Sequence, residues 1–210
     1  MQVTYLFDPL CGWCYGAGPS LEQLSHLKGI VLKLAPTGLF AGENARPMNA
    51  SFAAYAWQND QRIARLTGQQ FSQDYRDHVL GADDAMFDSA PATLGLVAVG
   101  LTAPEHEIKA LKLLQRARYV DGRNNCDLSV VADVLSAAGL NEAARRIASP
   151  DPELLEAYRT RIDDARRDMA RFGAQGVPSL IVEGAAGGQL LPSNLLFGDI
   201  TALASTLQTA

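Results

Sequence analysis

The sequence predicts an α/β protein whose sheet is built from both ends of the chain, with a helical domain inserted between them. Three observations favour this fold class. β-branched and apolar runs typical of strands occur near each end of the 210-residue chain. The roughly one hundred residues between them are rich in alanine and leucine with helical periodicity. Near the N-terminus, a strand, a helix and a second strand follow closely, which is typical of a βαβ unit with a parallel pair.

The N-terminal βαβ unit is expected within the first 36 residues. Residues 3–7 form the first strand, which Asp8 and Pro9 end. A helix over residues 11–27 follows, and we expect a bend near Pro19 because proline removes a helical hydrogen bond. Residues 30–34 then form the second, parallel strand.

The middle of the chain is expected to be helical throughout, with no strand signal of comparable strength. The segments with helical periodicity are 50–66, 69–80, 91–101, 105–120, 128–138 and 141–148. We therefore expect residues 48–151 to form a helical insertion domain. Residues 1–47 and 152–210 would form one discontinuous α/β domain.

The β pattern returns after a helix over residues 152–172. A strand over 179–183, a turn of small residues over 184–188 and a short strand over 189–191 predict a hairpin. A last helix is expected over residues 199–208.

The composition excludes few classes of protein, whereas the N-terminal sequence predicts the cellular compartment. A hydrophobic content of 48% and a charged content of 20% are ordinary for a globular protein, and the net charge of −5 argues against a nucleic-acid partner. No apolar stretch is long enough to span a membrane. Because Met1 is followed almost at once by the first strand, without a signal sequence, we expect a cytoplasmic protein.

The motif that carries chemistry is Cys11-Gly12-Trp13-Cys14, at the turn from the first strand to the first helix. A thiol at a helix N-terminus faces unpaired backbone N–H groups, which favour the thiolate. With two residues between the cysteines, the second thiol can reach a mixed disulfide formed on the first. In the cytoplasm such a pair is typical of catalysis or redox sensing rather than of a permanent disulfide. The motif therefore predicts a dithiol redox site.

Two other readings of the cysteines are weaker. A zinc site needs a second pair of ligands, but the only other cysteine is Cys126 and the three histidines have no ligand spacing. We therefore expect no metal. An inert structural pair is the remaining alternative.

Gly176-Val177-Pro178 directly precedes the C-terminal strand. A proline is tolerated at the first residue of a strand because its missing N–H is not needed there. The bond between a residue and a following proline is also where a cis peptide costs least. Together with the dithiol motif, this arrangement predicts a cis bond between Val177 and Pro178.

With these motifs, the chain resembles the DsbA superfamily of thioredoxin-fold dithiol oxidoreductases. The resemblance rests on residues 7–15 and 176–179, and Pro19 is similar to the helix-kinking proline of thioredoxins. Residues 119–140 look like the helical insertion of the cytosolic FrnE-like branch. The resemblance implies a thioredoxin-like fold with a large all-helical insertion.

The resemblance also implies roles for site residues. Cys11 would be the exposed attacking thiol and Cys14 the shielded resolving thiol. Pro178, in cis, would pack against the disulfide and leave the backbone of Val177 to pair with an extended substrate segment.

Gly12 and Trp13 would tune the thiol pKa and the docking surface for substrate.

Two features depart from the family pattern. Family members place a buried acid six residues before the first cysteine, where this chain has Tyr5, and Asp8 is acidic but is expected in the turn. Proton transfer at Cys14 would then use water or another group. The dipeptide between the cysteines also lacks the histidine of strongly oxidising members.

The predicted function is a thiol–disulfide oxidoreductase or isomerase that exchanges mixed disulfides with protein or small-thiol substrates. It would need no bound cofactor, with glutathione as a candidate redox partner. One alternative is a glutathione-dependent enzyme of the kappa-transferase or 2-hydroxychromene-2-carboxylate isomerase type, in which a serine commonly replaces the first cysteine. Another is a redox-switched partner-binding module. The oligomeric state is not predicted.

Two further groups have open roles. Cys126 is expected to be an inert small residue, with a third redox thiol as the alternative. Phe52, Tyr55 and Trp57 fall on one predicted helix at spacings that suit core packing. The alternative for these aromatic residues is the lining of a substrate groove next to Trp13.

Overall fold

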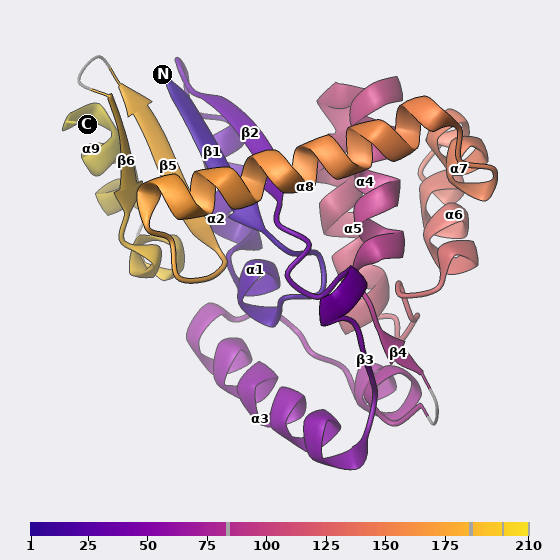
Figure 1. The fold of residues 1–210 in the computed structure, drawn as a ribbon. Coiled ribbons are helices and arrows are strands. Elements are labelled where there is room, and N and C mark those ends of the chain that lie inside the picture. The colour runs from indigo at the N-terminus through magenta and orange to yellow at the C-terminus, as the bar shows by residue number, and fades with distance from the viewer. Residues whose placement is uncertain (83–84, 185–186, 199, 210) are drawn as a thin grey trace.

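The central sheet joins the two ends of the chain. The computed structural model describes residues 1–82, 85–184, 187–198 and 200–209. The sheet order is β2-β1-β5-β6, formed by β1 (Gln2–Phe7), β2 (Val31–Pro36), β5 (Ser179–Gly184) and β6 (Gly187–Leu191). β1 is parallel to β2 and antiparallel to β5, and β5 is antiparallel to β6 (Figure 1). The predicted parallel pair and the C-terminal hairpin strands are confirmed. The hairpin turn at 185–186 lies outside the described residues.

β1 is the interior strand on which the site is built. Its residues after Gln2 are all buried, which is why residues 3–7 read as a continuous apolar run rather than an alternating one. Tyr5 lies opposite Leu34 on β2 and Leu180 on β5. The strand ends at Phe7, and the chain then turns directly into the segment that carries the two cysteines.

The predicted single helix over residues 11–27 is wrong in one respect. The structure has two helices, α1 (Gly12–Gly16) and α2 (Gly18–Ser25), which meet at Ala17. Pro19 lies in the first turn of α2. Proline is accommodated there because a first-turn N–H has no intrahelical partner to lose. The break therefore comes before the proline rather than at it.

The insertion follows the predicted helical pattern except in one segment. Its helices are α3 (Ala50–Thr67), α4 (Ala90–Thr102), α5 (Glu107–Tyr119), α6 (Leu128–Ala137) and α7 (Asn141–Ala148), with a short 3₁₀ turn, η3 (Pro104–His106), before α5. The helix predicted over 69–80 is confirmed only over residues 73–80. Residues 69–72 are not helical, and the helix begins at Gln73 and continues as the π-helical stretch η2 (Tyr75–Leu80). Gly68 ends α3 with φ +73°, and the Ser72 N–H donates to the carbonyl of Tyr119 on α5, so the segment between them follows α5 instead of coiling.

Short elements escaped prediction because two to five residues carry no periodic signal. They are η1 (Gly42–Asn44), β3 (Arg46–Pro47), β4 (Met86–Phe87) and η4 (Ser193–Phe197). β3 and β4 pair with each other as an antiparallel ladder outside the main sheet. They connect the loop after β2 to the insertion beside α3 (Figure 1).

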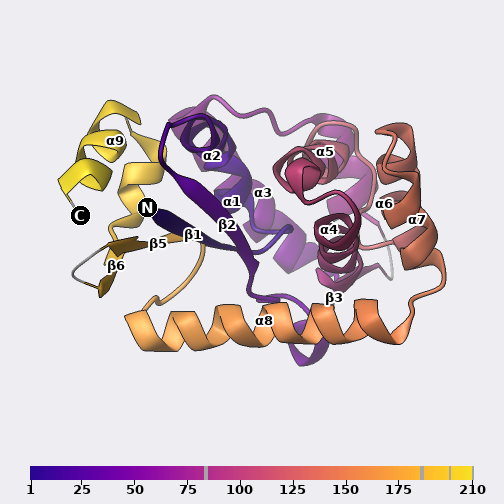
Figure 2. The ribbon, with the colours of Figure 1, turned by 90° about the horizontal axis from the view of Figure 1, so that it is seen from above.

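Helix α8 (Pro152–Phe172) links the insertion to the sheet. It extends along one side of both the strands and the helices α4 and α7, and it contacts α4, β2 and β6 (Figure 2). Asp151 caps its N-terminus by accepting a hydrogen bond from the Leu154 N–H. The last helix, α9 (Ile200–Thr209), matches its predicted position, although Asp199 lies outside the described residues.

One hydrophobic cluster runs from the sheet into the insertion. It joins Val3 and Leu180 of the sheet with Leu96 and Leu114 of the helical segment, and it includes Cys14. The α/β fold with a helical insertion is thus confirmed. The boundaries at residues 47/48 and 151/152 stay a prediction.

The contact that positions the site is the packing of α1 on α3. A Cβ atom placed on Gly16 would lie 2.7 Å from the Cγ2 atom of Ile63 and 3.3 Å from that of Thr67. A Cβ atom on Gly12 would lie 2.4 Å from the Oδ1 atom of Asp60. The two glycines are four residues apart on one face of α1, so their missing side chains let α3 approach the backbone of the dithiol motif.

Gly16→Ala should therefore destabilise the protein. The added methyl group meets two β-branched side chains that cannot move away freely, and such overpacking costs about 1–3 kcal/mol. Urea denaturation would measure the free energy of unfolding. Gly18→Ala is the matched control, because its Cβ would meet only the amide end of the Gln69 side chain. Equal or greater stability of Gly16→Ala would show that α1 and α3 are not closely packed.

Candidate functional site

The two cysteines differ in their access to solvent. Cys11 is the N-cap residue of α1, and its backbone N–H donates to the Asp8 carbonyl. Cys14 lies one turn further along and is buried in the main hydrophobic cluster. The exposed fraction is 8% for Cys11 and 1% for Cys14. The helix begins directly after the first cysteine, as predicted. The expectation that Cys11 is exposed is wrong, because it is buried under the cis-proline segment, although it has more access to solvent than Cys14.

The segment before β5 meets Cys11 across the end of the sheet. The Val177–Pro178 peptide bond is cis, as the sequence predicts. The Sγ atom of Cys11 lies 3.7 Å from the Val177 carbonyl oxygen, to which its S–H can donate. The Ser179 hydroxyl donates to the Gly176 carbonyl and holds the turn into the strand. Residues more than 160 positions apart are thus brought into contact.

The environment of Cys14 keeps its thiol protonated. Burial raises the pKa of Cys14 well above its usual value, and the neighbouring Cys11 sulfur raises it further through a hydrogen bond and its charge. The backbone N–H of Asp8 acts in the opposite direction. Cys14 therefore holds its proton at neutral pH.

Tyr5 occupies the position where the family resemblance expects a buried acid. It is fully buried, and its hydroxyl donates to the Cys14 carbonyl at 3.2 Å. Burial, followed by the charges of Cys14 and Cys11, raises the pKa of Tyr5 well above its usual value. Tyr5 is therefore a neutral hydrogen-bond donor that does not titrate near neutral pH.

Asp8 joins three segments of the fold. Its Oδ1 accepts from the Leu10 N–H at 2.9 Å, and its Oδ2 accepts from the Phe40 N–H at 3.2 Å and the Ser89 hydroxyl at 2.8 Å. The side chain is fully buried, and burial raises its pKa. Both carboxylate oxygens are thus occupied by structural hydrogen bonds. Asp8, which was expected only as a turn residue, is therefore a buried clamp, meaning a side chain whose hydrogen bonds hold three segments together.

Trp13 lies between two cavities. One, of about 560 Å³, extends along the cis-proline segment, with Trp13, Val177, Pro178 and Phe197 in its lining. The other, of about 330 Å³, lies on the side of the insertion, and Cys11 and Gly12 belong to its lining together with Trp13. The Trp13 ring meets Phe197 edge to face, with centroids 5.2 Å apart. We name these the cis-proline cavity and the insertion-side cavity.

The aromatic residues of α3 are not core residues. Phe52 and Tyr55 line the insertion-side cavity, and Tyr55 is 64% exposed, so the expected core packing is wrong for them. Trp57 is only partly buried. The physical reason is that α3 buries a narrow stripe, whose fully buried members are Asp60 and Ile63. The aromatic side chains border cavities on either side of that stripe.

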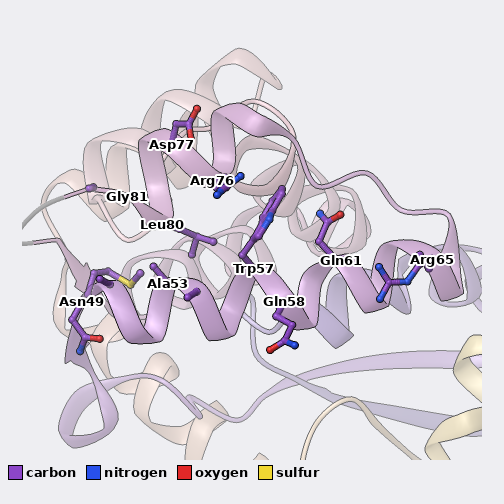
Figure 3. Close-up of a pocket in the computed structure, with 14 residues that line it drawn as sticks. Asn49, Ala53, Trp57, Gln58, Gln61, Arg65, Arg76, Asp77, Leu80 and Gly81 are labelled. Carbon is purple, nitrogen blue, oxygen red and sulfur yellow. The ribbon is translucent and has the colours of Figure 1, made fainter.

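Trp57 lies in a separate, larger cavity of about 1050 Å³ between α3 and η2 (Figure 3). The Arg76 guanidinium lies over the Trp57 ring, 5.4 Å from its centroid, and Arg65 and Asp77 add charge to the rim. Neither Cys11 nor Cys14 lines this cavity. It is therefore distinct from the dithiol site.

Asp60 belongs to the site, and the sequence reasoning missed it. It is 5% exposed, it lines the insertion-side cavity, and its Oδ2 accepts a hydrogen bond from the Tyr75 hydroxyl at 2.9 Å. Burial raises the pKa of Asp60 to about 7, although the Tyr75 hydrogen bond and the Arg118 charge oppose the rise. A sequence signal existed, because Asp60 interrupts the apolar stripe of Phe52 and Ile63 at helical spacing.

Cys126 lies apart from the dithiol motif. It is partly exposed and follows α5 in the loop before α6. Its Sγ atom lies 3.6 Å from the Nη1 atom of Arg118, which is fully buried. Cys126 lines neither of the two cavities beside Trp13. The structure does not bring it to Cys11, and whether it is inert stays a prediction.

Neither a metal site nor a membrane span is found among the described residues. In residues 1–82, 85–184, 187–198 and 200–209, no group of three or more His, Cys, Asp or Glu side chains could hold a metal ion. Within the same ranges, every helix is too short or too polar to cross a membrane.

Comparison with protein families decides the relationship. The model of the DSBA-like thioredoxin domain matches residues 2–199. The chain belongs to this family. The DsbA-superfamily resemblance and the thioredoxin-like fold with a helical insertion are thereby confirmed. Curated protein sequences give no match.

Solved structures in this family cover the full chain. The cytosolic disulfide reductase DsbM from Pseudomonas aeruginosa is 33% identical, with a TM-score of 0.88 and 100% coverage of both chains. A structure of DsbM with GSH gives a TM-score of 0.86, also at 33% identity, covering 100% of this chain and 98% of that one. A protein from Nitrosomonas europaea described as a putative protein disulfide isomerase is 24% identical, with a TM-score of 0.81 and coverage of 99% and 96%.

A 2-hydroxychromene-2-carboxylate isomerase is a more distant match. It is 19% identical, with a TM-score of 0.62 and coverage of 100% and 97%. This likeness shows a shared fold alone. The site of this chain contains two cysteines. Cys11 contacts the cis-proline segment, and Cys14 is buried.

Asp8→Asn should destabilise the protein, although the two side chains have the same shape. Asn replaces one acceptor oxygen with an NH₂ donor, so either the Leu10 N–H or the Phe40 N–H loses its partner. An unsatisfied buried donor costs about 1–3 kcal/mol. Urea denaturation would measure the loss. Asp88→Asn is the matched control, because its Oδ1 accepts only from the Ala90 N–H, which Asn can still satisfy. Equal stability of the two variants would contradict the clamp.

Proposed function

We propose that this protein is a cytoplasmic thiol–disulfide oxidoreductase that reduces disulfides by mixed-disulfide exchange through Cys11 and Cys14. The observation that carries the proposal is the asymmetry of the pair. Cys11 borders a cavity and contacts the Val177 carbonyl, whereas Cys14 is enclosed and its thiol pKa is raised. This is the division between an attacking and a resolving thiol.

The reaction has two exchange steps. The Cys11 thiolate attacks one sulfur of the substrate disulfide, and the other substrate sulfur leaves as a thiolate that takes up a proton. Cys14 then gives up its proton and attacks the Cys11 sulfur, which releases the second substrate thiol. The substrate is reduced and the enzyme carries a Cys11–Cys14 disulfide. The position of the two cysteines supports the second step, since Cys14 lies one helical turn from Cys11 and its pKa responds to the neighbouring Cys11 sulfur.

Residues around the motif would bind the substrate. In the proposal, an extended protein segment lies in the cis-proline cavity and pairs with the backbone of Val177, while Pro178 shields the disulfide. Gly12 admits the close approach of α3, and Trp13 forms the wall shared with the insertion-side cavity. Both protein disulfides and small disulfides fit this arrangement.

The reducing direction and the small-thiol partner rest on the comparisons and the motif. DsbM, at 33% identity over the full chain, is described as a cytosolic disulfide reductase and has been solved with GSH. We infer that glutathione re-reduces the Cys11–Cys14 disulfide here. The dipeptide Gly12-Trp13 lacks a histidine, which supports a reductase over a strong oxidant. Membership of the FrnE-like branch remains part of the proposal.

Cysteine variants test the two roles. With glutathione as reductant and bis(2-hydroxyethyl) disulfide as substrate, Cys11→Ser should fall to the uncatalysed rate because the attacking sulfur is gone. Cys14→Ser should accumulate a mixed disulfide on Cys11, visible by mass spectrometry, because nothing resolves it. Cys126→Ser is the control and should keep the wild-type rate.

Other outcomes would separate the alternatives. Full activity in Cys11→Ser would refute the oxidoreductase. A covalently captured partner in Cys14→Ser without turnover by the wild type would instead favour a redox-switched binding module. Saturable glutathione binding by a variant lacking both active-site thiols would favour the transferase or isomerase class.

The redox equilibrium tests the direction. In graded glutathione buffers we expect a reversible Cys11–Cys14 disulfide with a midpoint between those of glutaredoxins and thioredoxin, about −200 to −270 mV. A protein in this range can be reduced by the cytosolic glutathione pool and can reduce less stable disulfides. Quenching with an alkylating agent followed by mass spectrometry would give the reduced fraction. A midpoint near that of DsbA, about −120 mV, would mean that the protein oxidises its substrates.

A further inference from the structure

The insertion-side cavity contains a buried carboxyl group beside the attacking cysteine. Asp60 of α3 and Cys11 both line this cavity. The Oδ1 atom of Asp60 lies against Gly12, the residue that follows Cys11, at 2.4 Å from a Cβ placed there. Its Oδ2 is held by the Tyr75 hydroxyl, and across the described part of the chain no donor is directed at Oδ1. Oδ1 is therefore the Asp60 oxygen that lies against the dithiol helix α1.

Several elements place titratable groups around Asp60. Tyr75 comes from η2, Arg118 and Tyr119 come from α5, and Cys11 and Arg46 line the same cavity. The pKa values of Tyr75 and Tyr119 are raised well above the usual value, with burial as the main cause. Arg118 stays charged. Among these acids, Asp60 has a pKa of about 7, so both of its protonation states are populated at neutral pH.

The exchange reaction needs a proton near Cys11, and the other candidates do not supply one. Each substrate disulfide that is cleaved leaves behind a thiolate, and a basic thiolate departs faster when it is protonated. Tyr5 does not ionise near neutral pH, and both oxygens of Asp8 are occupied by structural donors. Cys14 keeps its proton for the second step.

We propose that Asp60 is the general acid–base residue of the dithiol reaction and protonates the thiolate that leaves into the insertion-side cavity. The inference rests on the proposed oxidoreductase function. The Cys11 thiolate forms a bond to one substrate sulfur while the substrate S–S bond breaks. The electron pair of that bond goes to the leaving sulfur, which takes the proton from Oδ1. The Asp60 carboxylate regains a proton from solvent, and a small thiol later reduces the enzyme disulfide.

The decisive test compares two leaving groups in single turnovers of the pre-reduced enzyme. Bis(2-hydroxyethyl) disulfide releases a basic alkyl thiolate, whereas 5,5′-dithiobis(2-nitrobenzoate) releases a weakly basic aromatic thiolate that needs no proton. For Asp60→Asn at pH 6, we expect a loss of about 10-fold or more with the alkyl disulfide and a change of less than about 2-fold with the aromatic one. Asn keeps the shape of Asp and can still accept the Tyr75 hydrogen bond.

The pH dependence gives a second readout. Asp60 can donate only while it is protonated, so the ratio of wild-type to Asp60→Asn rates should be largest below pH 7 and fall toward one above it. Glu43→Gln, which removes an exposed carboxylate of η1, is the matched control and should leave the wild-type profile unchanged.

Tyr75→Phe tests the role of Asp60 while leaving Asp60 itself in place. The Tyr75 hydrogen bond holds the pKa of Asp60 down, so its removal should move the fall in rate with the alkyl disulfide to higher pH. Circular dichroism would establish that each variant is folded. If Asp60→Asn does not fold, the position of the Tyr75→Phe profile decides the question, and an unmoved profile overturns the proposal.

The remaining outcomes separate this inference from the proposed function. Equal slowing of both disulfides by Asp60→Asn at every pH would mean that Asp60 is structural, and the inference would be wrong while the oxidoreductase stands. A wild-type protein that reduces neither disulfide would overturn both.

Discussion

The site depends on how closely α3 approaches α1. Gly12 and Gly16 leave one face of the dithiol helix without side chains, and Asp60 and Ile63 of the insertion fill that space. Any larger residue at these glycines would push α3 away from the cysteines. The insertion therefore supplies one wall of the site, and the sheet with its cis-proline segment supplies the other. A thioredoxin-like domain without the insertion would present Cys11 to solvent on that side.

That wall is held by buried polar groups as well as by packing. Arg118 is 1% exposed, and its guanidinium lies over the rings of Tyr75, Phe87 and Tyr119 at 5.3 to 5.9 Å. Its Nη1 also donates to side chains of the loop at 124–126. Within the described residues, no carboxylate lies at ion-pair distance from it.

An unpaired buried cation is costly, so the negative charge on Asp60 has a compensating role. Burial favours the neutral form of Asp60, whereas the Tyr75 hydrogen bond and the Arg118 charge favour the ionised form. Together these effects leave the pKa of the carboxyl at about 7. The aromatic rings around Arg118 fix its position, and through Tyr75 they fix that of Asp60. The groups that hold the insertion together around Arg118 thus also set the pKa of Asp60, the carboxyl group in the insertion-side cavity.

Local sequence patterns correctly predicted the features that depend on only a few neighbouring residues. The apolar run of β1, the dithiol motif at its end and the proline before β5 each carry their signal within a few residues. The sheet that unites them followed from their order along the chain. Five helices of the insertion were also predictable, since each is a run of helix-forming residues with a break at its end.

Features that depend on contacts between distant segments could not be predicted in the same way. The π-helical segment η2 forms where the chain follows α5, which the periodicity of residues 69–80 does not reveal. Phe52 and Tyr55 look like core residues in any single helix, and only the packing of the whole fold shows that they line a cavity. Asp60 gains its pKa from burial and from Arg118, 58 residues away in sequence, so the sequence shows only an acid on an apolar stripe.

The two cavities beside Trp13 suit the geometry of disulfide exchange. Attack occurs along the axis of the substrate S–S bond, so the sulfur that bonds to Cys11 and the sulfur that leaves lie on one line. The two halves of a substrate therefore separate in opposite directions from the attacked sulfur. A retained half in the cis-proline cavity has backbone to pair with, which suits a polypeptide. A leaving half in the insertion-side cavity meets aromatic walls and a carboxyl group that can protonate it. In the proposed reaction, the insertion thus serves the proton transfer, whereas the thioredoxin-like part serves the sulfur chemistry.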